Sequence, residues 1–287
     1  MSYPVLMSNS FIYTSVNLKI LRESSISLPL TDLGVLYGWG LFETIRIHNK
    51  KPILLDEHLA RLKKSARAIK IPLPFSPSEI KSHLDDLIMK ILKENYMALN
   101  NSTLNIYLTA GPTNPNNFYE STNPQLIIKF KHTPQQPAST NIIFAKAIYT
   151  RNNLNRYKTL AYLPNILEKK LHPNYFETIL HDQNQEILEG TKTSVFFIKN
   201  KEVITTLSPF ILPGITQNFL TLNQKEIGYR VTQRKVELSE LADFDEIFLT
   251  NSLGGVILVD SVHKYPNLKS EFISENIQSA YNNCLKL

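Results

Sequence analysis

Residues 36–46 read LYGWGLFETIR, and His58 and Arg61 follow this string at a short distance. Three more strings come later in a fixed order: 157–160 (YKTL), 189–191 (EGT) ahead of an apolar run, and 212–216 (LPGIT). The sequence contains no P-loop, no G-x-S-x-G nucleophile elbow and no dinucleotide-binding G-x-G-x-x-G. Each string alone says little, and their order along one chain is the informative feature.

The bulk composition excludes several classes of protein. With 287 residues, 43% of them hydrophobic and 20% charged, the chain resembles a globular protein with a substantial core. We find no apolar run of the ~20 residues that a membrane span needs and no secretory signal. The single cysteine, Cys284, cannot form an internal disulfide, which suits the cytoplasm. The net charge of +6 comes from scattered lysines, so we expect neither a nucleic-acid nor a membrane partner.

Hydrophobic periodicity predicts two α+β domains, at residues 1–131 and 141–287, joined by a linker at 132–140. The linker residues are polar, contain two prolines and lack periodicity. Short strands are expected within residues 1–55. Further strands are expected at 103–109, 125–130, 141–148, 175–181, 193–198, 229–236 and 244–250, and helices near 162–171, 214–227 and 270–285.

Two helices are predicted in more detail. The first has Asp56 as its N-cap and buries Leu59, Leu62, Ala66 and Ile69. The second begins at Ser76-Pro77-Ser78-Glu79, which has capping-box spacing with proline at the first helical position. Its predicted buried stripe is Ile80, Leu84, Leu87, Ile88 and Ile91, and Gly228 is a predicted C-cap further along the chain.

Lys158 and Glu189 are the candidate chemical groups. A lysine forms a Schiff base with an aldehyde and acts as a base when burial lowers its pKa, and the neighbours of Lys158 are largely apolar. Glu189 precedes an apolar strand, where a carboxylate needs a partner such as a protonated pyridine nitrogen. A surface lysine and a solvated turn glutamate are the alternatives for these two residues taken singly.

An anion site is predicted from backbone as much as from side chains. Gly214-Ile215-Thr216 stands where a helix begins, and such N–H groups bind phosphate. Asn251-Ser252 and the glycines that follow offer a second set of backbone N–H groups for an anion. The planar guanidinium of Arg46 could pair with the same phosphate. His58 and Arg61 lie on one side of a predicted helix. They could act in catalysis, or they could have a structural role in joining this helix to the sheet. No histidine spacing predicts a metal site.

Taken together, these strings resemble the class IV aminotransferase family, enzymes that use pyridoxal 5'-phosphate, over about Thr31 to Val262. The resemblance implies a two-domain fold-type IV enzyme, similar to D-amino acid aminotransferase, with the cofactor at the domain interface and a homodimeric assembly. It matches Lys158 to the Schiff-base lysine, Glu189 to the partner of the pyridine nitrogen and Leu212 to the residue beneath the ring. The matching phosphate positions are Arg46, Ile215, Thr216 and Ser252, with Asn251 beside them.

Within the family, LYGWGLFETIR and residues 54–62 (LLDEHLARL) are most similar to bacterial aminodeoxychorismate lyases. Such enzymes convert 4-amino-4-deoxychorismate to 4-aminobenzoate and pyruvate for folate synthesis, and Thr44 and Tyr162 are candidate substrate-side residues. The alternative is a transaminase for branched-chain amino acids. The D-amino acid branch carries an Arg-x-His pair where this chain reads PTNPNN, at 112–117. A catalytically silent binding protein is the remaining alternative, and retention of Lys158 and Glu189 opposes it.

Three residues depart from the usual family pattern. Ser194 replaces an asparagine, Gln217 an arginine, and Trp39 a small or acidic residue. The first two changes are expected to loosen the hydrogen bonds around the cofactor, and Trp39 to narrow the substrate side. The departures bear on substrate identity more than on cofactor binding.

Overall fold

The computed structural model describes residues 12–94, 99, 102–134 and 139–287. Its contacts divide the chain into two compact units. Unit 1 comprises Met1–Pro134 and Lys158–Ala161, and unit 2 comprises Gln135–Tyr157 and Tyr162–Leu287. The sequence-based division assigned Lys158–Ala161 to the C-terminal domain, but backbone hydrogen bonds join this segment to a strand of unit 1. Most of the expected linker lies at or beside residues 135–138, which fall outside the described residues.

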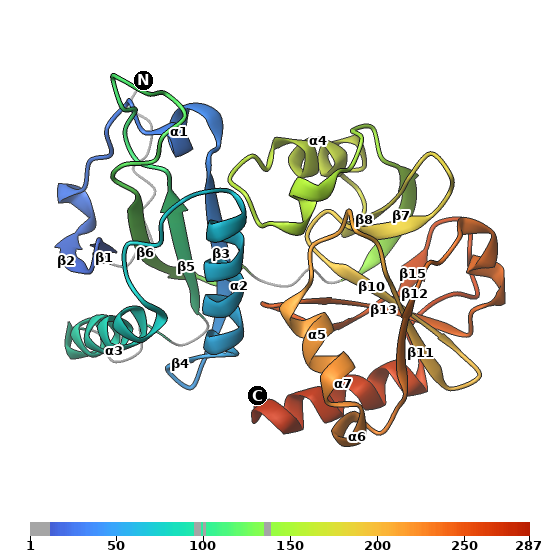
Figure 1. Ribbon diagram of the computed structural model, residues 1–287. Coiled ribbons are helices and arrows are strands. Elements are labelled where there is room, and N and C mark those ends of the chain that lie inside the picture. The colour runs from blue at the N-terminus through green and yellow to red at the C-terminus, as the bar shows by residue number, and fades with distance from the viewer. Residues whose placement is uncertain (1–11, 95–98, 100–101, 135–138) are drawn as a thin grey trace, which may run out of the picture. The chain divides into compact units, whose positions relative to one another are not determined.

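Unit 1 is built on a six-stranded antiparallel sheet in the order β2-β1-β6-β5-β3-β4 (Figure 1). The strands are β1 (Tyr13–Val16), β2 (Lys19–Arg22), β3 (Gly40–His48), β4 (Lys51–Pro52), β5 (Ser102–Thr109) and β6 (Gln125–His132). Its helices are η1 (Glu23–Ser25), α1 (Leu33–Tyr37), α2 (Leu55–Ala68) and α3 (Pro77–Glu94). The short helix α1 was not expected, and it is capped by the side chain of Asp32 and by Gly38 in a left-handed conformation.

The helices α2 and α3 cover one face of this sheet, where α2 contacts β3 and α3 contacts β1. Alternate residues of β3 are buried, starting with Leu41, because successive side chains of a strand point to opposite faces. The α3 prediction is confirmed in full. Ser76 and Glu79 form the capping box, and all five residues of the predicted stripe are buried.

The predicted start of α2 is wrong by two positions. The helix begins at Leu55, with Leu54 at the N-cap in a left-handed conformation at φ 53°. Asp56 therefore lies in the first turn, where its carboxylate is stabilised by the helix dipole. It accepts a hydrogen bond from Lys81 Nζ of α3 at 2.8 Å instead of capping the helix.

A charged cluster ties α2 to β3. Glu43 points into the buried face of the sheet, with 1% of its surface exposed. Arg61 donates to both of its oxygens, Nε to Oε1 at 2.8 Å and Nη2 to Oε2 at 2.6 Å, and His58 Nδ1 lies 2.6 Å from Oε2. Burial alone would raise the pKa of Glu43, but Arg61 and His58 outweigh it and hold this pKa at about 2. His58 and Arg61 thus serve the structural role that the sequence left open.

Among the described residues, unit 2 contains two sheets, with four α-helices and two short 3-10 helices beside them. The five-stranded sheet has the order β12-β11-β10-β13-β14, and the four-stranded sheet β15-β7-β8-β9. The first comprises β10 (Ser194–Lys199), β11 (Glu202–Thr206), β12 (Val231–Arg234), β13 (Glu246–Asn251) and β14 (Gly255–Leu258). The second comprises β7 (Asn141–Lys146), β8 (Glu177–His181), β9 (Ile187–Gly190) and β15 (Ser261–Val262). Beside them lie α4 (Leu163–Leu171), α5 (Ile215–Leu222), α6 (Gln224–Ile227), α7 (Phe272–Leu285) and the short helices η2 (Asn153–Arg156) and η3 (Leu238–Asp243).

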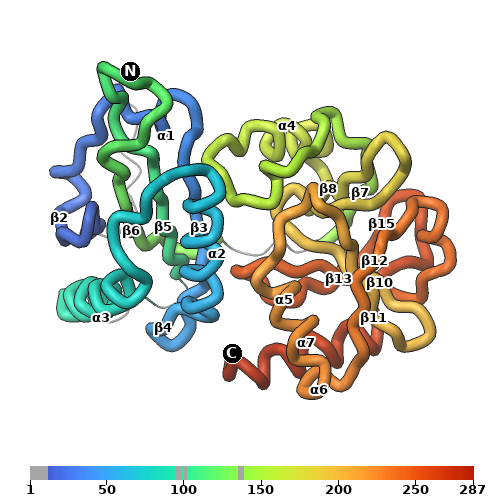
Figure 2. Tube along the Cα trace, in the orientation of Figure 1, coloured from blue at the N-terminus to red at the C-terminus, as the bar shows by residue number. Residues whose placement is uncertain are grey.

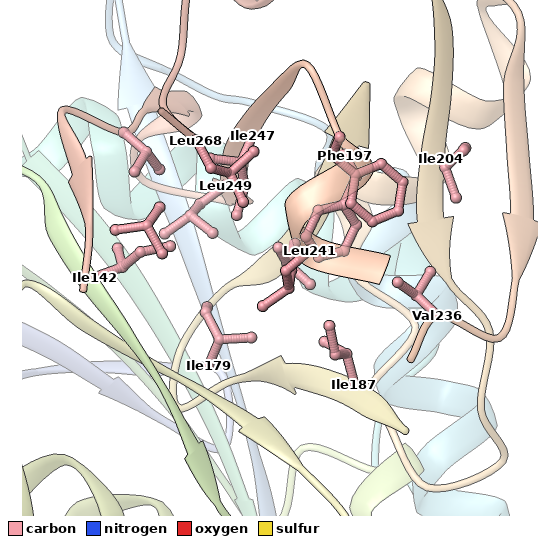
Figure 3. Close-up of a cluster of buried hydrophobic side chains, with 14 of the residues drawn as sticks. Ile142, Ile179, Ile187, Phe197, Ile204, Val236, Leu241, Ile247, Leu249 and Leu268 are labelled. Carbon is pink, nitrogen blue, oxygen red and sulfur yellow. The ribbon is translucent and has the colours of Figure 1, made fainter. Parts of the chain in front are cut away.

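Strand β10 lies between two apolar cores, which explains its unbroken hydrophobic sequence. Val195 and Phe197 face a cluster that includes Ile142 and Ile179 of the other sheet (Figure 3). Phe196 and Ile198 face the opposite cluster, formed with α5, α6 and α7. A strand that is buried on both faces reads as continuous apolar residues rather than as an alternation.

The helices α5, α6 and α7 lie beside the five-stranded sheet (Figure 2). The expected helix at 214–227 is two helices that meet at Asn223, and Gly228 ends the second in a left-handed conformation, as predicted. The strands β9, β11, β14 and β15 were not expected. They are short, and β9, β11 and β14 each pair with the strand just before them, whereas β15 pairs with the distant β7.

The buried stripe of α3 predicts a sharp asymmetry between two substitutions in one helix. Leu87→Ala should lower the free energy of unfolding by about 2–5 kcal/mol, because Leu87 is fully buried. Met89→Ala is the matched control: Met89 is 55% exposed, so its loss should change stability by about 0.5 kcal/mol or less. Urea unfolding followed by circular dichroism measures both. Equal losses would contradict the described orientation of α3.

The pKa of Glu43 predicts an acid-sensitive contribution to stability. Because this pKa falls from 4.5 to about 2 on folding, the stabilisation is complete above pH 4.5 and is lost as the pH drops toward 2. It amounts to about 3 kcal/mol. His58, whose pKa burial lowers, adds a loss of the same sign that begins at higher pH. Urea midpoints of Glu43→Gln across this range should lack the Glu43 portion, whereas Glu57→Gln, at an exposed position of α2, should follow the parent protein.

Candidate functional site

Lys158 reaches unit 1 as part of a short extended segment that continues its sheet. Phe42 N donates to Lys158 O, and Leu160 N donates to Gly40 O, each at 2.9 Å. Thr159 and Leu41 form an antiparallel bridge between them. The segment thus pairs with the edge of β3 that β4 leaves uncovered, since β4 pairs only with Ile47 and His48.

Two glycines of the LYGWGLFETIR string permit this pairing. A methyl group on Gly40 would come within 2.5 Å of Leu160 Cδ1 and 2.6 Å of Leu108 O. Gly38 has a φ of +68° and would bring a methyl group within 3.0 Å of Ala161 N. Only glycine satisfies both the close approach and the left-handed backbone here. These glycines therefore make room for the segment that carries Lys158.

Three of the predicted site residues, Lys158, Thr44 and Arg46, lie at the less buried face of β3. Lys158 Nζ lies 4.4 Å from the centre of the Phe42 ring, which faces the same side as Thr44 and Arg46 by strand alternation. Thr44 Oγ1 accepts a hydrogen bond from Asn105 Nδ2 at 3.0 Å. Within the described part of the chain Arg46 forms no ion pair, so its guanidinium is available to an anion.

Trp39 belongs to the other face. Its indole Nε1 donates to Ile69 O at 2.9 Å, at the end of α2. The expectation that Trp39 narrows the substrate side therefore does not match its contacts, because its one polar group holds the α2 terminus.

In unit 2, Glu189 is buried and held from two sides. Arg151 Nη1 donates to its Oε1 at 3.0 Å, and the backbone N–H of Leu212 donates to its Oε2 at 3.1 Å. Both side chains of the ion pair are about nine-tenths buried, with 8% of Arg151 and 10% of Glu189 exposed. The sequence did not single out Arg151. The only signal for it was the general rule that a buried carboxylate requires a partner, which does not say which of the basic residues supplies it.

Tyr162 stands just before α4 in the same unit. Its hydroxyl donates to Thr191 O at 2.5 Å, and Asn165 Nδ2 donates to the same oxygen at 2.7 Å. Burial, followed by the charges of Glu189 and Glu177, raises the pKa of Tyr162 to about 12. The phenol therefore remains protonated, and a hydrogen-bond donor, across the physiological pH range.

The predicted phosphate positions meet at the N-terminus of α5. Gly214 is its N-cap and supplies no side-chain cap, which leaves first-turn N–H groups for a ligand. Thr216 Oγ1 donates to Asn251 O at 3.1 Å, which joins α5 to the end of β13. Asn251 Oδ1 accepts from the N–H groups of Leu253 and Gly254, so the turn that contains Ser252 is held beside this helix start.

Two of the unusual residues contact each other. Ser194 Oγ lies 3.4 Å from Gln217 Oε1, which also accepts from Gly214 N at 3.2 Å. Gln217 Nε2 donates to Thr205 Oγ1 at 3.0 Å. Gln217 thus ties the start of α5 to β11 and accepts from the smaller Ser194, and the expected loosening around the cofactor stays a prediction.

In unit 2, the Arg151–Glu189 pair and the N-terminus of α5 suit a ring cofactor that carries an anionic group. The Nη2 atom of Arg151 is buried and has no hydrogen-bond partner, so an acceptor atom is missing next to Glu189. The uncapped start of α5 suits phosphate. A cofactor that combines a ring with hydrogen-bonding groups and a phosphate, such as pyridoxal phosphate, fits these features. Among the described residues, no group of three or more His, Cys, Asp or Glu side chains is arranged to hold a metal ion.

Comparisons with known proteins place the chain in a family. The family model for amino-transferase class IV matches residues 40–262. An aminodeoxychorismate lyase of Bacillus subtilis is 29% identical over 249 residues, covering 84% of each chain. A D-alanine aminotransferase of Bacillus licheniformis is also 29% identical, over 86% of this chain and 87% of its own.

A solved structure extends the likeness to the fold. The 4-amino-4-deoxychorismate lyase of Pseudomonas aeruginosa superposes with a TM-score of 0.79, covering 96% of this chain and all of its own, at 21% identity. This likeness confirms the predicted fold-type IV architecture. The chain belongs to the class IV aminotransferase family, whose members depend on pyridoxal phosphate, as its motifs predicted.

Proposed function

We propose that this protein is a pyridoxal-phosphate-dependent lyase that converts 4-amino-4-deoxychorismate to 4-aminobenzoate and pyruvate, a step of folate synthesis. The pairing of Lys158 with β3 carries the proposal, because it presents one lysine beside Phe42, Thr44 and Arg46. The choice of reaction within the family draws support from residues 36–46 and from the Bacillus subtilis relative. The site supports the cofactor chemistry more strongly than it supports one substrate.

The residues of both units would hold one cofactor molecule. Lys158 would bond to its aldehyde carbon, and Glu189, fixed by Arg151, would pair with its pyridine nitrogen. Arg46, Thr216, Ser252 and the backbone of Ile215 would bind the phosphate, with Asn251 supporting the turn and Leu212 beneath the ring. The proposal requires Lys158 of unit 1 and Glu189 of unit 2 to reach the same ring.

The reaction then depends on where Lys158 moves a proton. When bound, pyridoxal phosphate supplies an aldehyde that reacts with amines and a ring that accepts electrons. With the cofactor in place, Lys158 would yield the aldehyde carbon to the substrate amine and would then take the proton from the carbon that carries this amine. The carbon–oxygen bond to the pyruvyl group breaks, and the substrate ring becomes aromatic. Lys158 would give this proton to the methylene carbon of the departing enol, which yields pyruvate, and would then replace the amine of 4-aminobenzoate at the aldehyde carbon, which frees the second product. Thr44 and Tyr162 would orient the substrate.

The second candidate is a transaminase, which would use the same Lys158 to move a proton between substrate and cofactor. A D-alanine aminotransferase is as similar to this chain as the lyase relative is. Against the D-amino acid branch, the loop at 112–117 has no basic side chain to pair with a substrate carboxylate. A branched-chain substrate is the remaining form of this candidate. A silent binding protein would have no need of a buried Arg151–Glu189 pair with an unsatisfied N–H group.

We also propose that the protein works in the cytoplasm as a homodimer, as its family resemblance implies. The structure contains no helix suited to span a membrane within the described residues.

Unit 1 exposes an apolar patch around α1, in which Tyr37 and Phe118 pack edge to face at 5.2 Å. Large exposed apolar patches mark interaction sites. The exposed fractions are 86% for Leu30, 84% for Tyr119, 63% for Tyr37, 54% for Val35, 49% for Leu36 and 43% for Phe118.

The lyase assignment predicts a reaction that needs no amino acceptor. Purified protein with pyridoxal phosphate and 4-amino-4-deoxychorismate should release 4-aminobenzoate and pyruvate in equal amounts without a keto acid. Chromatography with absorbance detection and a coupled pyruvate assay measure the two products. Parallel reactions with leucine or D-alanine plus 2-oxoglutarate test the transaminases. Glutamate formation together with no 4-aminobenzoate would refute the lyase proposal in favour of a transaminase.

The control for this assay is a pair of lysine variants. Lys158→Ala should abolish turnover while leaving circular dichroism unchanged, because the amine that lies 4.4 Å from the centre of the Phe42 ring is then lost. Lys170→Ala, at an exposed position of α4, should retain the parent rate. Full turnover by Lys158→Ala would place the chemistry elsewhere.

The dimer proposal predicts a measured mass of about twice 32.9 kDa, the mass of one chain. Tyr119→Asp should shift the protein toward the monomer, because it places a charge in the exposed apolar patch. Asp243→Ala, an exposed position in unit 2, should leave the mass unchanged. Light scattering coupled to size-exclusion chromatography gives the masses. A parent protein that remains monomeric at high concentration would exclude the homodimer.

A further inference from the structure

Glu177 is a fully buried carboxylate that the proposed reaction does not use. It accepts five hydrogen bonds. Its Oε1 accepts from Thr178 N at 2.9 Å, Thr191 N at 3.1 Å and Thr191 Oγ1 at 2.6 Å. Its Oε2 accepts from Lys192 N at 3.1 Å and Thr193 Oγ1 at 3.0 Å. Glu177 forms no ion pair with any residue that the structure describes, so backbone and hydroxyl dipoles stabilise its charge.

Four of the five donors come from the turn at 191–193, which follows Glu189 after one residue. This turn is closed by Gly190 N donating to Thr193 O at 2.8 Å. Gly190 packs directly against the carboxylate, since a methyl group there would come within 3.0 Å of Glu177 Cδ. The carboxylate therefore acts as the centre around which the chain turns immediately after Glu189.

Thr191 connects this centre to the candidate site. Its N–H and hydroxyl bind Glu177, while its carbonyl oxygen accepts from Tyr162 at 2.5 Å and from Asn165 at 2.7 Å. The two hydrogen bonds from Thr191 to Glu177 therefore fix the orientation of the Thr191 carbonyl group. Displacing Thr191 would move the acceptor that holds the Tyr162 hydroxyl.

We propose that Glu177 is a positioning residue for the cofactor site: by anchoring Thr191 it fixes the places of Tyr162 and Glu189. The inference rests on the proposed binding of pyridoxal phosphate beside these two residues. Glu177 itself touches neither substrate nor cofactor. Its charge also adds to the burial and the Glu189 charge that keep the Tyr162 phenol protonated.

Glu246 provides a matched control in the same unit. It is 5% exposed and also binds backbone N–H groups and a hydroxyl, those of Glu271, Ile273 and Ser274 at the start of α7. Replacing it removes a comparable buried anion without affecting the turn at 191–193. A general loss of stability and a specific loss of positioning can therefore be separated.

The test compares Glu177→Gln with Glu246→Gln in the full-length protein. Three quantities are measured: the melting temperature, the dissociation constant of pyridoxal phosphate from its visible absorption, and amide exchange of residues 189–193 without cofactor. Both variants should melt earlier. Only Glu177→Gln should exchange faster at 189–193 and bind the cofactor about tenfold more weakly, the lower end of what loss of a supporting partner does to metal sites. Equal effects of both variants on affinity and exchange would overturn the proposal.

A second variant covers the case in which Glu177→Gln does not fold. Thr193→Val removes one of the five donors and should weaken cofactor binding in the same direction by a smaller factor. Unchanged affinity and exchange in this variant would also overturn the proposal. A protein that binds cofactor but does not release 4-aminobenzoate would refute the lyase and leave this test intact. If the parent protein binds no cofactor, the proposed function fails, and so does the role of Glu177 that rests on it.

Discussion

Two backbone hydrogen bonds, between Phe42 and Lys158 and between Leu160 and Gly40, bring a residue from the middle of the chain into unit 1. They depend on glycine at position 40, where any side chain would meet Leu160 and the carbonyl of Leu108. They also determine which side of β3 the Lys158 amine faces. Phe42, Thr44 and Arg46 project from that side, whereas Glu43 projects from the other. The spacing of the LYGWGLFETIR string therefore follows from the need to receive the lysine segment.

Three buried carboxylates show three ways of stabilising a negative charge in the interior. Glu43 is paired with Arg61 and His58 and ties a helix to a sheet. Glu177 forms no ion pair with a described residue and is surrounded by N–H and hydroxyl donors. Glu189 is paired with Arg151, one nitrogen of which still lacks an acceptor. A buried guanidinium nitrogen normally has an acceptor, so the unsatisfied Arg151 Nη2 beside Glu189 suits a ligand.

Local signals in the sequence predicted local structure well. The capping box at Ser76 and the apolar stripe from Ile80 to Ile91 decided α3, because both act within a few turns of one helix. Asp56 was misplaced because aspartate is favoured both at the N-cap and in the first turn, and Leu54 in a left-handed conformation took the cap position. The short strands β9 and β14 were missed although each pairs with the strand just before it, because four residues that are mostly buried on both faces show no alternation.

The candidate site was predicted through motif resemblance rather than through chemistry alone. Lys158 and Glu189 were found by their strings, but Arg151 and Glu177 have no motif and become visible only when their contacts are known. The covalent site of the cofactor tests the account most directly. Reducing the cofactor-bound protein with borohydride and mapping its peptides by mass spectrometry identifies the lysine that carries the cofactor. The account predicts a single modified residue, Lys158, and modification of another lysine with Lys158 untouched would contradict it.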